Sequence, residues 1–179
     1  MTHSIPHIAP DNIEKNTGKL LPYKTVLEDE VKSANHYFYP HQLIYSKVRP
    51  KLNKVVLVKF EGLCSADMYP IKPLIHSRFL QAGMLSQYFL EEVNKFDNRV
   101  KMPKINQTQL SQIPIPLPPL AEQERIVAKL EKLMKFCDEL EANIRHARAN
   151  ADSLLQTALK EALMRPISKK LQNYSAPST

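Results

Sequence analysis

The most constraining feature of this 179-residue sequence is an apolar pattern through residues 126–158, whose steps alternate between four and three residues. A pattern sustained for more than four heptads predicts a long helix that pairs with another helix in a coiled coil. The predicted contact positions form two interleaved series, with Ile126, Leu133, Leu140, Ala147 and Leu154 in one and Leu130, Cys137, Ile144, Ala151 and Ala158 in the other. Because a helix of this length cannot cover its own apolar stripe, we expect these positions to form a dimerisation interface.

The predicted coiled-coil helix spans 119–165 and is roughly 70 Å long at 1.5 Å per residue. Pro119 suits the first helical position, and Glu122 suits the positive end of the helix dipole. Pro166 predicts the end of the helix, with a flexible tail at 166–179. Together these contact positions form the seam of the helix, and several of the later ones are alanines. This favours an antiparallel partner helix that places large residues opposite small ones.

Residues 1–118 are predicted to form a small α+β domain with a mixed sheet, because segments with strand character precede segments with a helical period. Residues 42–48 and 54–60 are rich in β-branched and aromatic side chains, which is typical of strands, and Pro50 predicts a turn between them. Residues 67–72 contain a proline and are therefore expected to form an edge strand.

A helix capped by Ser77 is predicted to follow the strands. Its apolar face is indicated by steps of four, four and three between Leu85, Phe89, Val93 and Phe96. Asn106, with Gln109 three residues later, resembles a short capping box and predicts a single helical turn at 107–112.

A proline-rich segment, 113–119, joins this domain to the long helix and must be extended. A stiff connector is the favoured interpretation. A ligand for a proline-binding domain is the alternative, and the apolar residues Ile113, Ile115 and Leu117 disfavour it because they suit burial.

The scarcity of glycine excludes several enzyme classes. Only three glycines occur, so neither a dinucleotide-binding nor a nucleotide-phosphate loop can be assembled. The motif of adenine methyltransferases is absent, because 117–120 reads Leu-Pro-Pro-Leu, without the required polar residue. Glu61 and Asp67 imitate a nuclease carboxylate pair, but no lysine at a matching spacing accompanies them. We therefore expect no catalytic residue and no cofactor in this chain.

Metal and disulfide sites are also disfavoured. The histidines show no metal-ligand spacing with the two cysteines, and His36 and His41 are interpreted as loop residues. Cys64 and Cys137 lie far apart and in different kinds of segment, so they give no disulfide framework. The sequence holds no run long and apolar enough for a membrane span and no signal peptide, which favours the cytoplasm.

Positive charge is concentrated in the front domain. The net charge is +7, of which +5 lies in residues 1–120, and this favours a polyanionic partner. Two clusters border predicted turns or helix ends, where loops present contacts. Their candidate DNA-binding residues are Lys47, Arg49, Lys51 and Lys54 in the first cluster, and Arg99, Lys101, Lys104, Asn106 and Gln107 in the second.

The cationic side chains of these clusters are expected to meet phosphates, whereas the two amides have the groups to bond base edges. Asn106 has a second interpretation, as the cap of the turn that follows it. For any single lysine, a merely solvated position is the competing interpretation.

One segment resembles a known family closely. Residues 113–127, IPIPLPPLAEQERIV, resemble the end of a target-recognition domain in the specificity subunits of type I restriction–modification systems. Residues 102–106 (MPKIN), 43–54 (LIYSKVRPKLNK) and 62–67 (GLCSAD) are similar to further segments of such domains. The resemblance covers about residues 5–165, and the proline-rich segment is its most specific part.

This resemblance implies that the chain reads one half of a bipartite site in double-stranded DNA, with the long helix as an antiparallel spacer. It implies methyltransferase subunits, which carry S-adenosylmethionine, and a motor–nuclease subunit, which uses ATP and Mg²⁺, as partners. The sequence departs from the family in having one recognition domain, one such helix and no tryptophan. A native half-subunit that forms a homodimer, a truncated gene and an excised fragment are all compatible with that departure. The rival hypotheses are a coiled-coil dimer whose front domain binds protein, and a degenerate remnant.

Overall fold

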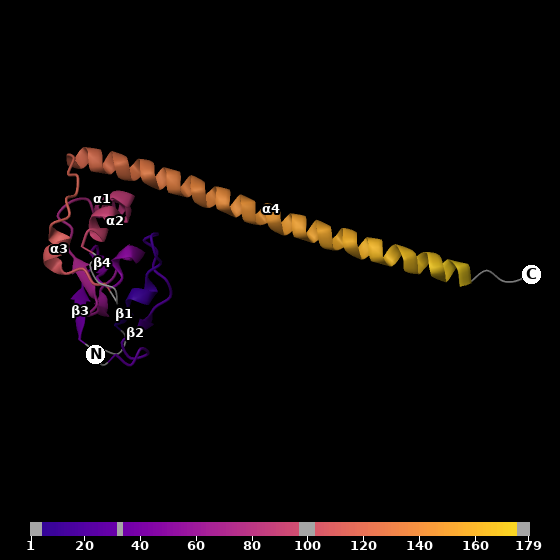
Figure 1. Ribbon diagram of the computed structural model, residues 1–179, viewed down its shortest axis with the longest axis horizontal. Helices are drawn as coiled ribbons and strands as arrows, with labels where there is room; N and C mark the ends of the chain where they lie inside the picture. Colours follow the sequence, from indigo (N-terminus) through magenta and orange to yellow (C-terminus); the bar gives the residue numbers. More distant parts are fainter. Residues whose placement is uncertain (1–4, 32–33, 97–102, 175–179) are drawn as a thin grey trace, which may run out of the picture. The chain divides into compact units, whose positions relative to one another are not determined.

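The computed structural model describes residues 5–31, 34–96 and 103–174, with side chains as far as residue 163 (Figure 1). The chain divides into two compact units, residues 1–128 and 129–179. The boundary lies inside the long helix rather than at residue 118, because the first turns of that helix belong to the front unit. Gln123 and Val127, on those turns, are buried.

One sheet of the front unit is mixed, as the sequence predicted. Its strand order is β2-β1-β6-β3, with β1 parallel to β6 and the other pairs antiparallel. The strands are β1 (Pro6–Ile8), β2 (Lys24–Thr25), β3 (Asn35–Phe38) and β6 (Gly62–Ser65). Next to β1 lies a 3-10 turn, η1 (Pro10–Asn12). The first three strands are short and lie in a segment where the sequence placed no strand.

The second sheet has the order β5-β4-β7 and is antiparallel throughout. Its strands are β4 (Leu43–Ser46), β5 (Val55–Leu57) and β7 (Met68–Ile71), and a 3-10 turn, η2 (Pro50–Leu52), joins β4 to β5. The predicted strand pair, the turn at Pro50 and the edge position of the proline-containing strand are all confirmed. With a mixed sheet, helices and the long C-terminal helix, the chain has the expected α+β fold.

Strand β4 connects the two hydrophobic cores of the front unit. All four of its residues are buried, and successive side chains point to opposite faces of the strand. Leu43 and Tyr45 belong to the core that includes Phe89 and Val93. Ile44 belongs to the other core. Because both faces of β4 are packed in a core, the C-terminal end of the strand is held in place, and the candidate site begins there.

The helical segment after Ser77 differs from the prediction. It forms two helices, α1 (Ser77–Leu85) and α2 (Gln87–Asn94), which are separated at Ser86. Ser86 is extended, and its hydroxyl accepts a hydrogen bond from the Phe89 backbone N–H at 3.2 Å, so it caps α2. The cap of α1 is His76 and not Ser77, because the His76 ring accepts from the Phe79 backbone N–H.

The connector is extended, as predicted, but its apolar residues do not behave alike. Ile113 is buried in a core, and Ile115 packs against the same core. Leu117, which the sequence also assigned to the interior, is exposed. Two of the three apolar residues therefore anchor the connector.

The long helix, α4, spans Leu120–Tyr174. It begins one residue after Pro119, whose carbonyl accepts from the backbone N–H groups of Glu122 and Gln123. It also continues past Pro166, where the sequence predicted its end. Proline fixes φ near the helical value and removes one backbone hydrogen bond, so a helix can pass through it at a cost. In the described ranges, no helix has the length and apolar content that a membrane crossing requires.

Candidate functional site

One lysine of each basic cluster lies in a shared part of the front unit, although the two are far apart in sequence. The chain after β4 lies beside the segment that leads to α3 (Gln107–Ser111), and Val48 forms an isolated bridge with Lys104. The Ile105 backbone N–H donates to the Lys47 carbonyl at 3.0 Å, and the Arg49 N–H donates to the Pro103 carbonyl at 2.8 Å. These bonds place Lys47 and Lys104 in one local surface.

A carboxylate lies between the two lysines. Asp67 Oδ1 accepts from Lys104 Nζ at 2.9 Å and lies 3.8 Å from Lys47 Nζ. The Asp67 backbone carbonyl also accepts from the Lys47 N–H, at 3.0 Å. The side chains of Lys47, Lys104 and Asp67 are 23%, 40% and 41% exposed, so all three remain accessible to a ligand.

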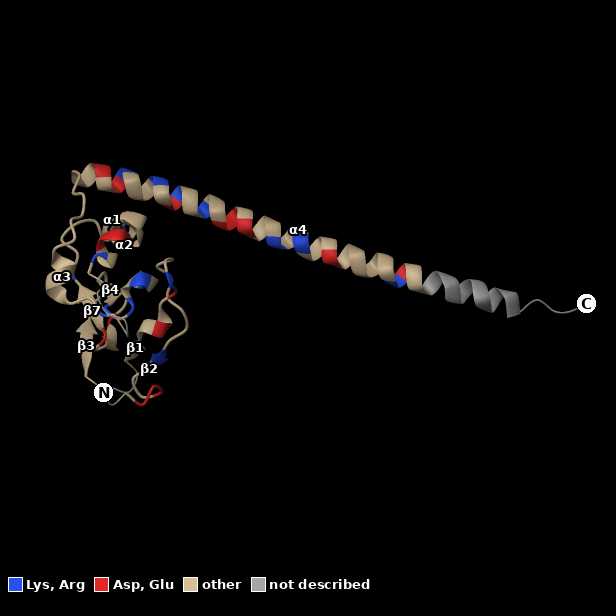
Figure 2. Cartoon of the chain, viewed as in Figure 1, with Lys and Arg blue, Asp and Glu red and all other residues tan. Residues whose placement is uncertain are grey.

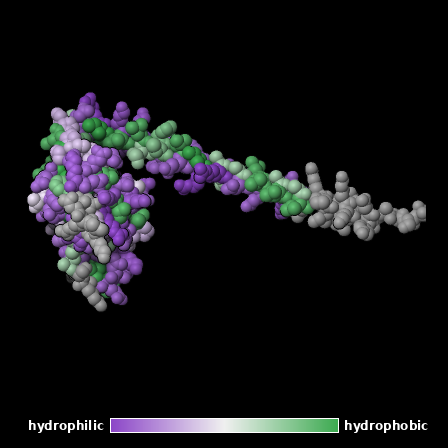
Figure 3. Space-filling view, viewed as in Figure 1, coloured by the Kyte–Doolittle hydropathy of each residue, from purple (hydrophilic) through white to green (hydrophobic). Residues whose placement is uncertain are grey.

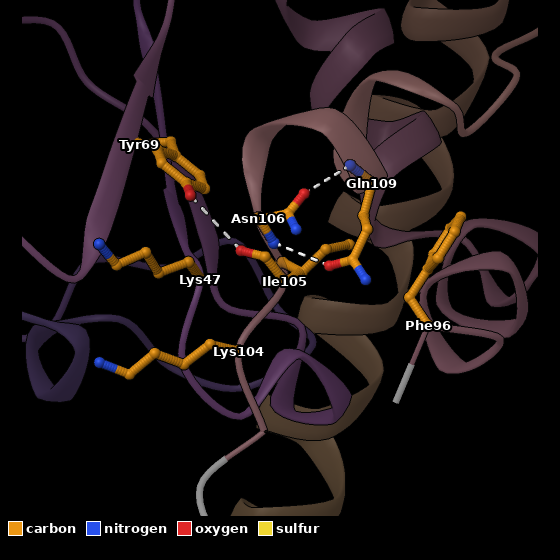
Figure 4. A pocket seen from close by; sticks show the side chains of 7 residues that line it. All are labelled: Lys47, Tyr69, Phe96, Lys104, Ile105, Asn106 and Gln109. Carbon is orange, nitrogen blue, oxygen red and sulfur yellow. Dashed lines mark hydrogen bonds between the residues drawn. The ribbon is translucent and has the colours of Figure 1, made fainter. Parts of the chain in front are cut away.

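Beside these lysines is a pocket of about 290 Å³, whose side chains are drawn in Figure 4. It is lined by Lys47, Tyr69, Phe96, Lys104, Ile105, Asn106 and Gln109. Lys47 Nζ lies 5.5 Å from the centroid of the Tyr69 ring, within the range of a cation–π contact. The Tyr69 hydroxyl lies 3.5 Å from the Ile105 carbonyl, to which it donates. Ammonium groups, amides and aromatic faces together suit phosphates and base edges.

Asn106 forms the cap that the sequence offered as one of its two roles. Its Oδ1 accepts from the Gln109 N–H at 2.8 Å, and its own N–H donates to Gln109 Oε1 at 3.0 Å. The capping box is therefore confirmed. Gln107, the first residue of α3, is exposed beside it. The amide Nδ2 of Asn106 is not part of the capping box, so the cap leaves that donor available to the pocket.

The remaining cationic candidates occupy different positions. Arg49 and Lys51 are exposed at η2, and Arg49 has a left-handed backbone with φ of 48°. Lys54 is only 14% exposed, and its Nζ donates to the Pro10 carbonyl at 2.7 Å and lies 3.5 Å from Asp11. Its ammonium group is thus used inside the domain. Arg99 and Lys101 lie outside the described residues.

Sequence reasoning missed two residues of this site, Asp67 and Tyr69. The sequence places Asp67 in a nuclease-like carboxylate pair, in the edge strand and in a family-like segment, and Tyr69 in the edge strand, but it assigns neither to the DNA-binding clusters. Asp67 lies in the turn between β6 and β7, Tyr69 lies on β7, and the pairing of β7 with β4 brings them beside Lys47. No spacing in the sequence indicates this contact, because it depends on strand register.

The described residues of the front domain form neither a metal centre nor a site with a reactive thiol. Among the residues that the structure describes, no group of three or more His, Cys, Asp or Glu side chains could hold a metal ion. Cys64 is buried, and burial raises the pKa of its thiol to about 11, which disfavours the nucleophilic thiolate.

The seam of α4 presents its apolar side chains to solvent. Ile126 is half-buried in the front unit. In the second unit the large seam residues are exposed: Leu130, Leu133, Cys137, Leu140, Ile144 and Leu154. Met134 and Phe136 flank the seam and are exposed as well, so the stripe is wider than the sequence pattern indicated. Figure 3 shows hydrophobic surface along α4, and Figure 2 shows acidic and basic residues distributed along the same helix.

Comparison with known proteins gives one consistent family. Residues 3–147 match the family model described as type I restriction modification DNA specificity domain. The chain is 47% identical over 156 residues to the type I restriction enzyme EcoDI specificity subunit of Escherichia coli, covering 87% of this chain and 35% of that protein. It is 38% identical over 58 residues to the StySPI specificity subunit of Salmonella potsdam, covering 32% of this chain and 12% of that protein.

Solved structures of the same kind share the fold. The HsdS subunit from Thermoanaerobacter tengcongensis superposes with a TM-score of 0.73 at 27% identity, covering 88% of this chain and 42% of that one. A chain from a study of complex assembly and conformational transition in the type I R-M system gives a TM-score of 0.75 at 26% identity, covering 88% and 43%. The chain thus spans about a third of the length of its EcoDI relative and less than half of either solved chain.

Proposed function

Because this chain belongs to the family of type I restriction–modification DNA specificity domains, we propose that its front domain reads one half of a bipartite DNA site. We further propose that α4 pairs with a second copy of the chain and carries the subunits that modify and cut DNA. Specificity subunits of this family recognise DNA and are not themselves catalytic, so S-adenosylmethionine, ATP and Mg²⁺ are assigned to the partner subunits.

The observation that carries the DNA-binding proposal is the meeting of Lys47 and Lys104 at the pocket. Two ammonium groups from distant segments lie around one carboxylate, next to an exposed amide and an aromatic ring. Lysines at such a place neutralise phosphates and fix the register of the protein on the duplex, whereas amides read bases. Arg49 and Lys51, exposed at the adjacent turn, extend the cationic surface.

Replacing Lys47 and Lys104 by alanine tests this assignment. If both contact phosphates, the double variant binds duplex DNA of any sequence more weakly. The slope of log K against log salt then becomes shallower by about 0.9 for each contact. Lys24→Ala, on β2 of the other sheet, is the control for loss of a charge. Unchanged affinity and slope in the double variant would remove these lysines from the DNA interface and favour a protein ligand for this surface.

An antiparallel dimer explains the distribution of large and small residues along the seam. In this register the midpoints of the two seams lie opposite each other. Every contact position of one series on the first helix then faces a position of the other series on the second helix. The resulting layers pair Ile126 with Ala158, Leu133 with Ala151, Leu140 with Ile144, Cys137 with Ala147 and Leu130 with Leu154. Three of the five layers place an alanine opposite a larger side chain, which supports this register.

Disulfide trapping distinguishes the antiparallel dimer from a parallel one. In the proposed register, Ala147→Cys crosslinks to the native Cys137 of the second copy under mild oxidation, and the unmodified chain does not crosslink. In a parallel, in-register pair the native cysteines face each other, so the unmodified chain crosslinks as well. Cys137→Ser combined with Ala147→Cys is the matched control, since it crosslinks only in the parallel arrangement.

The assembly of further subunits on α4 is supported by the width of its apolar stripe. A two-helix seam uses the alternating positions alone, whereas Met134 and Phe136 lie beside that seam and are also exposed. Helices packed in a bundle need such a broader face. We therefore assign these flanking residues to contacts with the methyltransferase subunits, and the motor–nuclease subunit to the completed complex.

A further inference from the structure

The carboxylate of Asp67 occupies an unexpected place for a surface that binds a polyanion. It lies in the turn between β6 and β7, where its backbone N–H donates to Ser65 Oγ at 3.3 Å. Its side chain contacts both lysines of the pocket, at 2.9 Å and 3.8 Å. A negative charge at this point opposes the attraction of phosphate for the same two lysines.

The geometry gives Asp67 two effects on those lysines. Its hydrogen bond to Lys104 and its ion pair with Lys47 hold two flexible side chains near one point. The side chains then lose less conformational entropy when a ligand binds. The two lysines carry a formal charge of +2, and the Asp67 carboxylate lowers the total for the three groups to +1. Because the Asp67 side chain is 41% exposed, a phosphate brought to the lysines approaches the carboxylate too.

We propose that Asp67 is a positioning residue that holds Lys47 and Lys104 and lowers the affinity of this surface for duplex DNA. Binding to non-cognate DNA depends almost entirely on phosphate attraction, whereas cognate binding gains further contacts to bases. A charge that reduces the phosphate attraction weakens binding to both kinds of site, and non-cognate DNA shows this effect without added base contacts. This inference rests on the proposed function of the same surface.

The size of the effect follows from counterion release. Loss of the Asp67 charge leaves the equivalent of one more lysine charge for phosphate, so the slope of log K against log salt becomes steeper by about 0.9. At about 0.1 M salt this corresponds to roughly eightfold tighter binding of arbitrary duplex DNA, and the gain disappears toward about 1 M.

Asp67→Asn is the most direct variant, because the amide oxygen still accepts from Lys104 while the charge is lost. Asp67→Glu keeps the charge, and Asp67→Ser is a second charge-free variant should the asparagine variant fold poorly. Asp11→Asn is the matched control, since it also removes a lysine-paired aspartate, but its partner Lys54 is bound to the Pro10 carbonyl. The dissociation constant for a duplex of arbitrary sequence is measured between about 0.05 and about 0.4 M salt.

The proposal expects tighter binding and a steeper slope for the charge-free variants, with Asp67→Glu and Asp11→Asn close to the unmodified protein. Equal gains for Asp67→Asn and Asp11→Asn would overturn it, because net charge alone would then explain the effect. An unchanged slope in Asp67→Asn, with a clear loss in the double variant of Lys47 and Lys104, would overturn the role of Asp67 and leave the DNA surface intact. No effect of either set of variants would overturn both proposals.

Discussion

Shortening two leucines of the α4 seam should dissociate the proposed dimer without unfolding the helix. Leu133 and Leu140 are 52% and 49% exposed in the single chain, so about half of each side chain remains to be covered by a mate. Full burial of a leucine contributes about 1.5–3 kcal/mol, and covering the exposed half therefore contributes about 1 kcal/mol. A two-fold dimer contains each leucine twice. The variant with both leucines changed to alanine then loses about 4 kcal/mol, or roughly a thousandfold in Kd.

Alanine has the highest helix propensity, so the double variant keeps α4 helical, and circular dichroism should show unchanged helix content. Sedimentation velocity over a range of concentrations gives the change in Kd. Lys135→Ala with Glu139→Ala is the control, since these residues form an exposed i,i+4 pair that the seam does not include. Replacing the two leucines by lysine should dissociate the dimer more completely, because unpaired charges would be buried. A dimer that survives both double variants would place self-association on another surface.

Two further predictions concern the Asn106 cap and the two cysteines. Asn106→Ala should lower the free energy of unfolding by about 1 kcal/mol through loss of the cap, measured by denaturant titration, and an unchanged stability would show that the cap contributes nothing. In the variant with both seam leucines changed to alanine, where the seam is uncovered, Cys137 should react quickly with a thiol reagent at neutral pH and Cys64 slowly, because Cys64 is buried and its raised pKa leaves little thiolate. The Cys64 rate should rise as the pH approaches about 11, and equal rates for the two cysteines at neutral pH would contradict its burial.

The sequence predicted those parts of the fold that local patterns determine. The strands around Pro50, the edge strand with Pro70 and the capping box at Asn106 each depend on residues close together in the chain, and each is confirmed. The long helix was indicated by a repeat sustained over many turns. The sequence did not predict that the helix continues past Pro166. The hydrogen bonds of the helical residues on both sides of a proline can offset the backbone hydrogen bond that it removes.

What the sequence did not predict depends on contacts between distant segments. Strand β1 has three residues, and its position is set by parallel pairing with β6 rather than by its own composition. The break at Ser86 was hidden because the apolar spacing continues across it, with Phe89 and Val93 buried on α2. The site itself was predicted as two basic clusters, but Asp67 joins them only once β7 pairs with β4.

Selection from a pool of random duplexes tests the central claim most directly. A two-fold dimer of DNA-reading domains should enrich an inverted repeat, with two identical half-sites separated by a spacer of fixed length and no preferred sequence. The dimer-disrupting leucine variant should lose the fixed spacing. Enrichment of no sequence at all, or of one continuous site without a spacer, would contradict the account of this chain as a DNA-reading domain paired through α4.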